Sequence, residues 1–117
     1  MKKTIIIGIF LTMLLSCEAI FVENISDETV EVLAPKSELT VDAGSITFSW
    51  EELEGTDEYH LKIATPNFLN ASQIVLDTVI EKRFFSQSLS TGEYEWTIIG
   101  KNSEYETLEE IYKLTIR

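Results

Sequence analysis

The sequence predicts an all-β sandwich of about seven short strands, preceded by a signal peptide. Apolar residues alternate with polar ones along most of the chain after residue 29. A period of two is typical of strands with one buried and one solvated face. Glycine and proline separate the alternating segments at the short spacing that is typical of sandwiches. A separate apolar run, which ends at a lone cysteine, predicts the signal peptide.

The N-terminal segment has the layout of a secretory signal. Lys2 and Lys3 precede an apolar stretch at residues 4–15. The stretch ends in Leu14-Leu15-Ser16-Cys17, which resembles the lipobox of bacterial lipoproteins. The resemblance implies that residues 1–16 are removed and that Cys17 is lipidated, with palmitate as an expected acyl group. Lipidation would also account for the only cysteine of a secreted chain, which would otherwise be a free reactive thiol.

Two other interpretations of this segment stay open. An uncleaved membrane anchor needs about 20 apolar residues, but Glu18 would lie inside such a span. An ordinary secretory signal prefers small residues at the cleavage site and two positions before it. Ser16 meets the first condition, whereas Leu14 does not meet the second. The lipoprotein interpretation is therefore preferred.

The lipobox resemblance also predicts a location. Glu18, and not aspartate, follows the cysteine, which favours the outer membrane over the inner one. Acidic residues soon after the cysteine resemble the surface-export signals of Bacteroidota, but Ala19, Ile20 and Phe21 make the match partial. We therefore expect a lipid-anchored protein of the bacterial cell envelope, with surface exposure left open.

The charge of the chain excludes some partners. All 20 acidic residues follow Cys17, whereas two of the nine basic ones precede it, so removal of residues 1–16 leaves seven basic residues and a net charge of −13. Nucleic acid is a poor partner for this surface. An anionic membrane would repel it, so attachment must come from the lipid. The remaining 101 residues form one small domain with an apolar core and no disulfide.

The mature chain divides into two parts. Residues 17–28 hold the lipidated cysteine and a tether with a polar end, although residues 20–22 are apolar enough to dock as an extra edge strand. Residues 29–117 form the sandwich. Residues 104–110 are expected to be a loop or a short strand. The predicted strands lie at residues 30–32, 46–50, 59–63, 74–80, 83–86, 94–98 and 112–116.

Several of these segments resemble a known family. Trp50, Tyr59 and the run Leu89-Ser90-Thr91-Gly92-Glu93-Tyr94-Glu95-Trp96 resemble a fibronectin type III domain. The resemblance implies an immunoglobulin-like (fibronectin type III-like) β-sandwich. It also implies that Tyr94 buries its ring at a corner while its hydroxyl bonds the backbone. Residues 59–64 and 92–96 are similar to immunoglobulin-like modules of Bacteroidota lipoproteins. The fold hosts many functions, so the resemblance does not identify one.

Catalytic and metal-binding chemistry has little support in the sequence. His60 is the only histidine and is predicted to face solvent, because it lies between the inward-facing Tyr59 and Leu61. No Ser-His-Asp triad is indicated. An acidic loop could offer oxygen ligands to calcium, but it lacks the spacing of a calcium-binding loop. We therefore expect no metal, no cofactor and no enzyme activity. The acidic residues of this loop are Glu51, Glu52, Glu54, Asp57 and Glu58.

Three aromatic residues are candidates for a binding surface. Phe68 and Tyr105 lie in predicted loops, and Phe84 neighbours Phe85, so that only one of the pair can point inward. Exposed aromatic rings form binding patches, although packing in the core or in a hairpin is the alternative for all three. Thr78 lies in Asp77-Thr78-Val79, which resembles an O-glycosylation acceptor of Bacteroidota. An ordinary strand threonine is the alternative.

The sequence thus predicts a monomeric, lipid-anchored module that binds a protein or a glycan. A structural subunit of a surface assembly, with no ligand of its own, is the alternative. An enzyme is a remote alternative.

Overall fold

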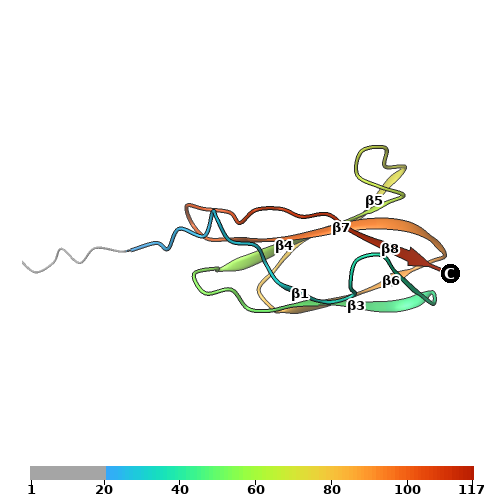
Figure 1. Cartoon of the computed structure of the whole chain (residues 1–117), viewed down its shortest axis with the longest axis horizontal. Coiled ribbons are helices and arrows are strands. Elements are labelled where there is room, and N and C mark those ends of the chain that lie inside the picture. Colours follow the sequence, from blue (N-terminus) through green and yellow to red (C-terminus); the bar gives the residue numbers. More distant parts are fainter. Residues whose placement is uncertain (1–20) are drawn as a thin grey trace, which may run out of the picture.

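Residues 21–117 form two β-sheets and contain no helix in the computed structural model, which describes this part of the chain (Figure 1). The all-β prediction is confirmed. The predicted signal peptide at 1–16 and the lipidation site Cys17 lie outside the described residues. The eight strands are β1 (Val32–Ala34), β2 (Leu39–Val41), β3 (Gly44–Trp50), β4 (Glu58–Thr65), β5 (Gln73–Ile80), β6 (Phe84–Leu89), β7 (Gly92–Lys101) and β8 (Tyr112–Ile116).

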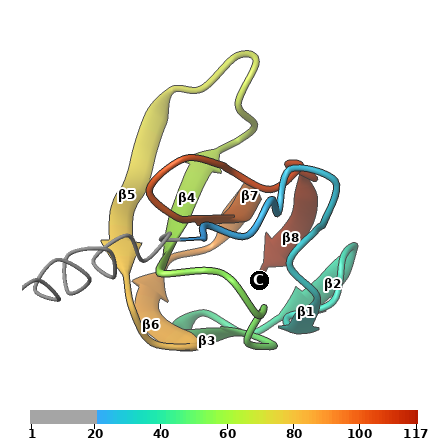
Figure 2. The ribbon, with the colours of Figure 1, turned by 90° about the vertical axis from the view of Figure 1, so that its left-hand side faces the viewer.

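The strands pack as two layers. One sheet has the order β1-β3-β6, and the other has the order β2-β8-β7-β4-β5 (Figure 2). All pairs are antiparallel except β2 and β8, in which Leu39 lies opposite Leu114 and Val41 opposite Ile116. The sequence did not predict β2, so the strand count rises from about seven to eight. No helix among residues 21–117 has the length and hydrophobicity to cross a membrane.

The core lies between the two sheets and is built on aromatic rings. Phe48 and Trp96 meet edge to face, with ring centroids 4.8 Å apart, which is a preferred geometry for aromatic pairs. Trp50 lies 5.7 Å from the ring of Tyr59. Phe48, Trp50 and Trp96 are at most 1% exposed. The alternation that predicts which residues of these strands point inward is therefore confirmed.

The predicted tyrosine corner is present. Tyr94 is buried, and its hydroxyl donates to the carbonyl oxygen of Ser90 over 2.8 Å. This bond closes the turn between β6 and β7, where the chain crosses from one sheet to the other.

Folded contacts begin before residue 29, where the sequence places the start of the domain. Ile25 is fully buried, and the carbonyl oxygen of Glu28 accepts a hydrogen bond of 2.9 Å from the backbone N–H of Leu108. Residues 25–28 are thus part of the sandwich and not of a tether. The polar cluster at residues 24–28 is irregular, as the sequence predicts, and only the burial of Ile25 departs from that expectation.

Two further expectations concern irregular segments. Phe21 is 85% exposed, and no strand is assigned at residues 21–31, so Phe21 does not dock as an edge strand. Residues 102–111, between β7 and β8, contain only an isolated bridge from Lys101 to Glu106. The expected loop at 104–110 is confirmed.

Candidate functional site

Two of the predicted binding residues lie at opposite ends of the sandwich. Phe68 is in the β4–β5 loop and Tyr105 in the β7–β8 loop, at the two ends of β4, because β4 starts opposite Lys101 and ends opposite Glu95 (Figure 1). Both side chains are half-buried. The backbone N–H of Phe68 donates to the Glu95 carboxylate over 3.0 Å, and that of Tyr105 to Asn102 Oδ1 over 2.8 Å. The structure does not bring them into one site.

Phe84 is the third predicted binding residue, and its ring is exposed. The side chain is 53% accessible at the start of β6. Its neighbour Phe85 packs against the core. The prediction that only one of this pair points inward is therefore confirmed.

Thr78 lies on the inner face of its sheet. It pairs with Leu61 in the antiparallel neighbour β4, and directly opposite residues of such a pair point to the same face. Leu61 is fully buried. Thr78 itself is half-buried because β5 is the last strand of the sheet.

The single histidine faces the opposite, outer side of this sheet. His60 Nε2 contacts Asp77 Oδ1 on the neighbouring strand. The five residues of the acidic loop do not converge. Within residues 21–117, no group of three or more histidine, cysteine, aspartate or glutamate side chains is placed to hold a metal ion.

An apolar surface that the sequence reasoning missed lies where β5 turns into β6. A groove of about 830 Å³ is lined by Val79, Ile80, Phe84 and Phe85 together with Glu81, Lys82 and Ser86. We call this set the β5–β6 groove. Val79 is 49% exposed, and Ile74, further back on β5, is 51% exposed. In Figure 2, β5 and β6 follow one another along the same side of the sandwich, each at the end of its sheet.

A sequence signal for this surface existed. The run Ile74-Val75-Leu76 and the pair Val79-Ile80 place apolar residues on both faces of β5. A strand that is apolar on both faces is expected to be covered on both. Because β5 is an edge strand, the outward Ile74 and Val79 stay exposed.

In the groove, a lysine without a salt-bridge partner among residues 21–117 lies near an exposed ring. Lys82 Nζ lies 5.8 Å from the ring centroid of Phe84, within the range of a cation–π contact. Within residues 21–117, Lys82 and its neighbour Arg83 make no salt bridge. Three of the other cations pair with carboxylates: Lys62 with Glu109, Lys101 with Glu106 and Arg117 with Asp42.

One tyrosine has a shifted pKa. Burial, together with a hydrogen bond to the Glu110 carboxylate and the charge of that group, raises the pKa of Tyr112 to about 12. The hydroxyl donates to Glu110 Oε1 over 3.0 Å, and the ring lies 5.0 Å from Trp96. Tyr112 therefore links the core to the β7–β8 loop.

The fold matches that of known fibronectin type III domains. A fibronectin type III domain from the human KIAA0970 protein superposes with a TM-score of 0.56 at 12% identity, over 79% of this chain and 74% of that one. The fibronectin(III)-like modules of Clostridium thermocellum CbhA superpose with a TM-score of 0.55 at 10% identity, over 75% and 95%. Domains d3–d4 of the rat CD45 extracellular region give 0.50 at 11% identity, over 98% and 79%.

No protein-family model matches the chain, and neither does any curated protein. The structural matches show an immunoglobulin-like, fibronectin type III-like β-sandwich, as the sequence predicts. At 10–12% identity they show the fold alone.

Proposed function

We propose that this protein is a lipid-anchored binding module of the bacterial outer envelope. A lipid on Cys17 holds the chain at the outer membrane, and the sandwich presents a recognition surface to a protein or a glycan. The lipobox resemblance supports the anchor. The charge of −13 after Cys17 is compatible with the anchor, because the lipid and not the charge would hold so acidic a domain at an anionic surface.

The observation that carries the binding role is the concentration of exposed apolar side chains between residues 69 and 84. Leu69 is 88% exposed at the β4–β5 loop, and Ile74, Val79 and Phe84 follow along β5 and into β6. Val79 and Phe84 line one groove, and clustered exposed apolar side chains on an otherwise charged domain mark an interaction site. Binding residues on a rigid sandwich concentrate in such loops and edges. Phe84 is accordingly the principal aromatic contact, because its ring is more exposed than those of Phe68 and Tyr105.

Acylation tests the anchor. The full chain, expressed in a bacterium and labelled with a fatty-acid probe, is expected to incorporate label and to fractionate with the outer membrane. Cys17→Ala should abolish labelling and leave the precursor uncleaved. Ser16→Ala is the matched control, since it keeps a small residue before the cysteine and should be processed normally. Normal processing of Cys17→Ala would overturn the lipoprotein proposal.

A further inference from the structure

We infer that the open edge of β6 binds an extended peptide strand of a partner protein, in which apolar residues alternate with carboxylates. This inference rests on the proposed binding role, for which it names the site and the kind of partner. Strand addition at a sheet edge uses backbone hydrogen bonds for affinity and side-chain pockets for specificity. The β6 edge offers both.

The backbone of β6 is free along one side. Within residues 21–117, β6 pairs with β3 only. The backbone N–H of Trp50 donates to the carbonyl oxygen of Arg83 over 3.0 Å, which sets the alternation along the strand. Phe85 and Gln87, in phase with Arg83, therefore direct their backbone groups to β3. Phe84, Ser86 and Ser88 direct theirs to the open side.

The other edges of the two sheets are protected, whereas β6 is not. Natural edge strands are blunted by short length, bulges, charges or proline. β1 and β2 have three residues each, and the pairing of β1 and of β5 with its neighbour is interrupted by a register shift. β6 has six residues, pairs with β3 in one uninterrupted register, and contains no charge, proline or glycine.

The β5–β6 groove supplies the side-chain specificity. Side chains of an added strand alternate in direction, so every second one lies on the face of the exposed Phe84 ring, beside the groove that Val79 also lines. Lys82 and Arg83, which have no carboxylate partner within residues 21–117, stand at the start of the strand. Carboxylates on the remaining positions would complement them.

A second copy of this chain fits the edge less well. Its own β6 has no charged residue and would bring no carboxylate to Lys82 or Arg83. Two chains of charge −13 also repel one another. A partner of different sequence is therefore the occupant that the charges favour.

Binding of a designed peptide tests the inference. The probe is a fluorescein-labelled peptide of about nine alternating valine and glutamate residues, a length that spans an edge strand. Its binding to the detergent-solubilised full chain is followed by fluorescence anisotropy. We expect saturable binding, and binding at least about tenfold weaker for the valine–lysine counterpart.

Two substitutions at one position isolate the backbone edge. Ser86→Pro removes an N–H that faces the open side and leaves the bonds to β3 intact, since proline is tolerated at such edge positions. Ser86→Ala is the matched control, because it loses the same hydroxyl contact with Thr47 but keeps the N–H. Ser86→Pro should weaken binding about tenfold or more relative to Ser86→Ala. Circular dichroism verifies that both remain folded.

A charge reversal keeps the inference testable even if Ser86→Pro unfolds. Lys82→Glu combined with Arg83→Glu should weaken the valine–glutamate peptide and strengthen the valine–lysine peptide. Absence of binding at millimolar peptide, or equal binding by Ser86→Pro and Ser86→Ala, would overturn the inference. So would a dimer that Ser86→Pro dissociates, because the edge would then belong to a second copy. None of these readouts depends on Cys17, so loss of the anchor and loss of the site are distinguishable.

Discussion

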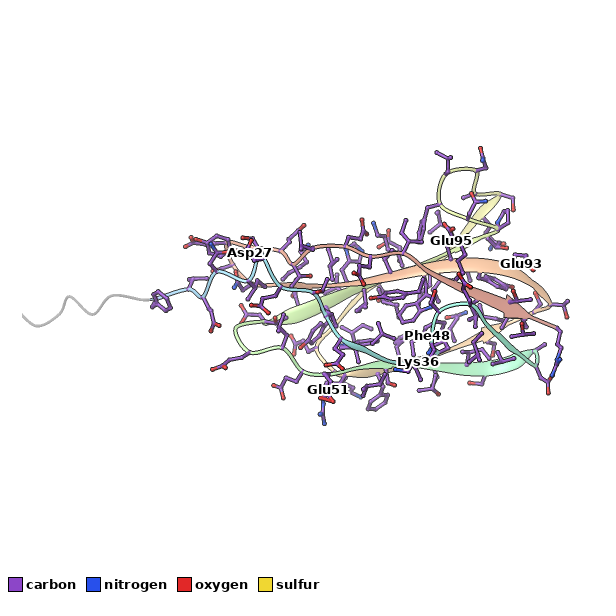
Figure 3. All side chains as sticks on the ribbon, viewed as in Figure 1. Asp27, Lys36, Phe48, Glu51, Glu93 and Glu95 are labelled. Atoms are coloured by element: carbon purple, nitrogen blue, oxygen red, sulfur yellow. The ribbon has the colours of Figure 1, made fainter. Side chains whose placement is uncertain are left out.

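The side-chain amide of Asn102 donates to the backbone carbonyl oxygen of Glu23 over 2.8 Å and thereby joins the N-terminal segment to the β7–β8 loop. The same nitrogen donates to the carbonyl oxygen of Gly55 over 2.9 Å. Its Oδ1 accepts from the backbone N–H groups of Glu104 and Tyr105. One side chain thus holds three segments together at the end of the sandwich where the chain enters. Figure 3 shows Asp27 of the entering segment at that end.

Asn102→Ala is expected to lower the free energy of unfolding by about 1–3 kcal/mol, because it leaves several backbone groups without their partner. Chemical denaturation of the full chain measures the change. Ser103→Ala, at an exposed neighbouring position, is the control and should change it by less than about 0.5 kcal/mol. Equal stability of the two variants would show that water replaces the amide at no cost.

Ile25→Ala should cost about 2–5 kcal/mol, the usual range for truncating a fully buried isoleucine. Phe21→Ala, at an 85% exposed position, is the matched control and should be nearly neutral. A fragment of residues 29–117 should likewise be less stable than one of residues 22–117. If Ile25→Ala and Phe21→Ala unfolded alike, residues 25–28 would be a tether after all.

Tyr94→Phe tests the tyrosine corner. It keeps the buried ring and deletes only the hydroxyl that bonds Ser90, so we expect a loss of about 1–2 kcal/mol from the free energy of unfolding. Tyr105→Phe is the control, since the structure shows no hydrogen bond of the Tyr105 hydroxyl within residues 21–117. Equal unfolding midpoints in denaturant for both variants would contradict a stabilising corner.

The pattern of the sequence predicted those features that local alternation encodes. Three inward apolar residues lie on each of β3, β4, β7 and β8. The period of two therefore predicts that these strands exist and which of their faces is buried. β2 has only three residues and is stabilised by parallel pairing with β8, a distant contact that leaves no local period.

The same difference between local alternation and distant contacts explains which candidate binding residues the sequence could place. Phe84 and Phe85 lie on a strand, where alternation requires one of them to be outside. Phe68 and Tyr105 lie in loops, where no period reports burial. Their backbone N–H groups donate to Glu95 and Asn102, which are long-range or turn contacts that alternation does not encode. The apolar residues on both faces of β5 are visible in the sequence, but their exposure in the β5–β6 groove depends on which strands end the sheets, which is a property of topology.

Tyr112 predicts a change of stability at alkaline pH. Its pKa of about 12 in the folded chain is above the ordinary value of 10.0, so ionisation favours the unfolded chain. Its contribution to stability is complete below about pH 10 and is lost as the pH rises towards 12. Ultraviolet titration should show a tyrosine that ionises near pH 12, and Tyr112→Phe should remove that step. An identical titration curve near pH 12 for the unchanged chain and Tyr112→Phe would contradict the shift.

Adjacent phenylalanines give the sharpest test of the binding surface. Phe84→Ala removes a ring that is 53% exposed, so the free energy of unfolding should change by less than about 1 kcal/mol. It should nevertheless weaken the valine–glutamate peptide, because the groove loses its exposed aromatic wall. Phe85→Ala, one residue further into the core, should cost about 3 kcal/mol of stability. If Phe84→Ala destabilised the fold as much as Phe85→Ala, the ring would belong to the core and the groove would lose its principal contact.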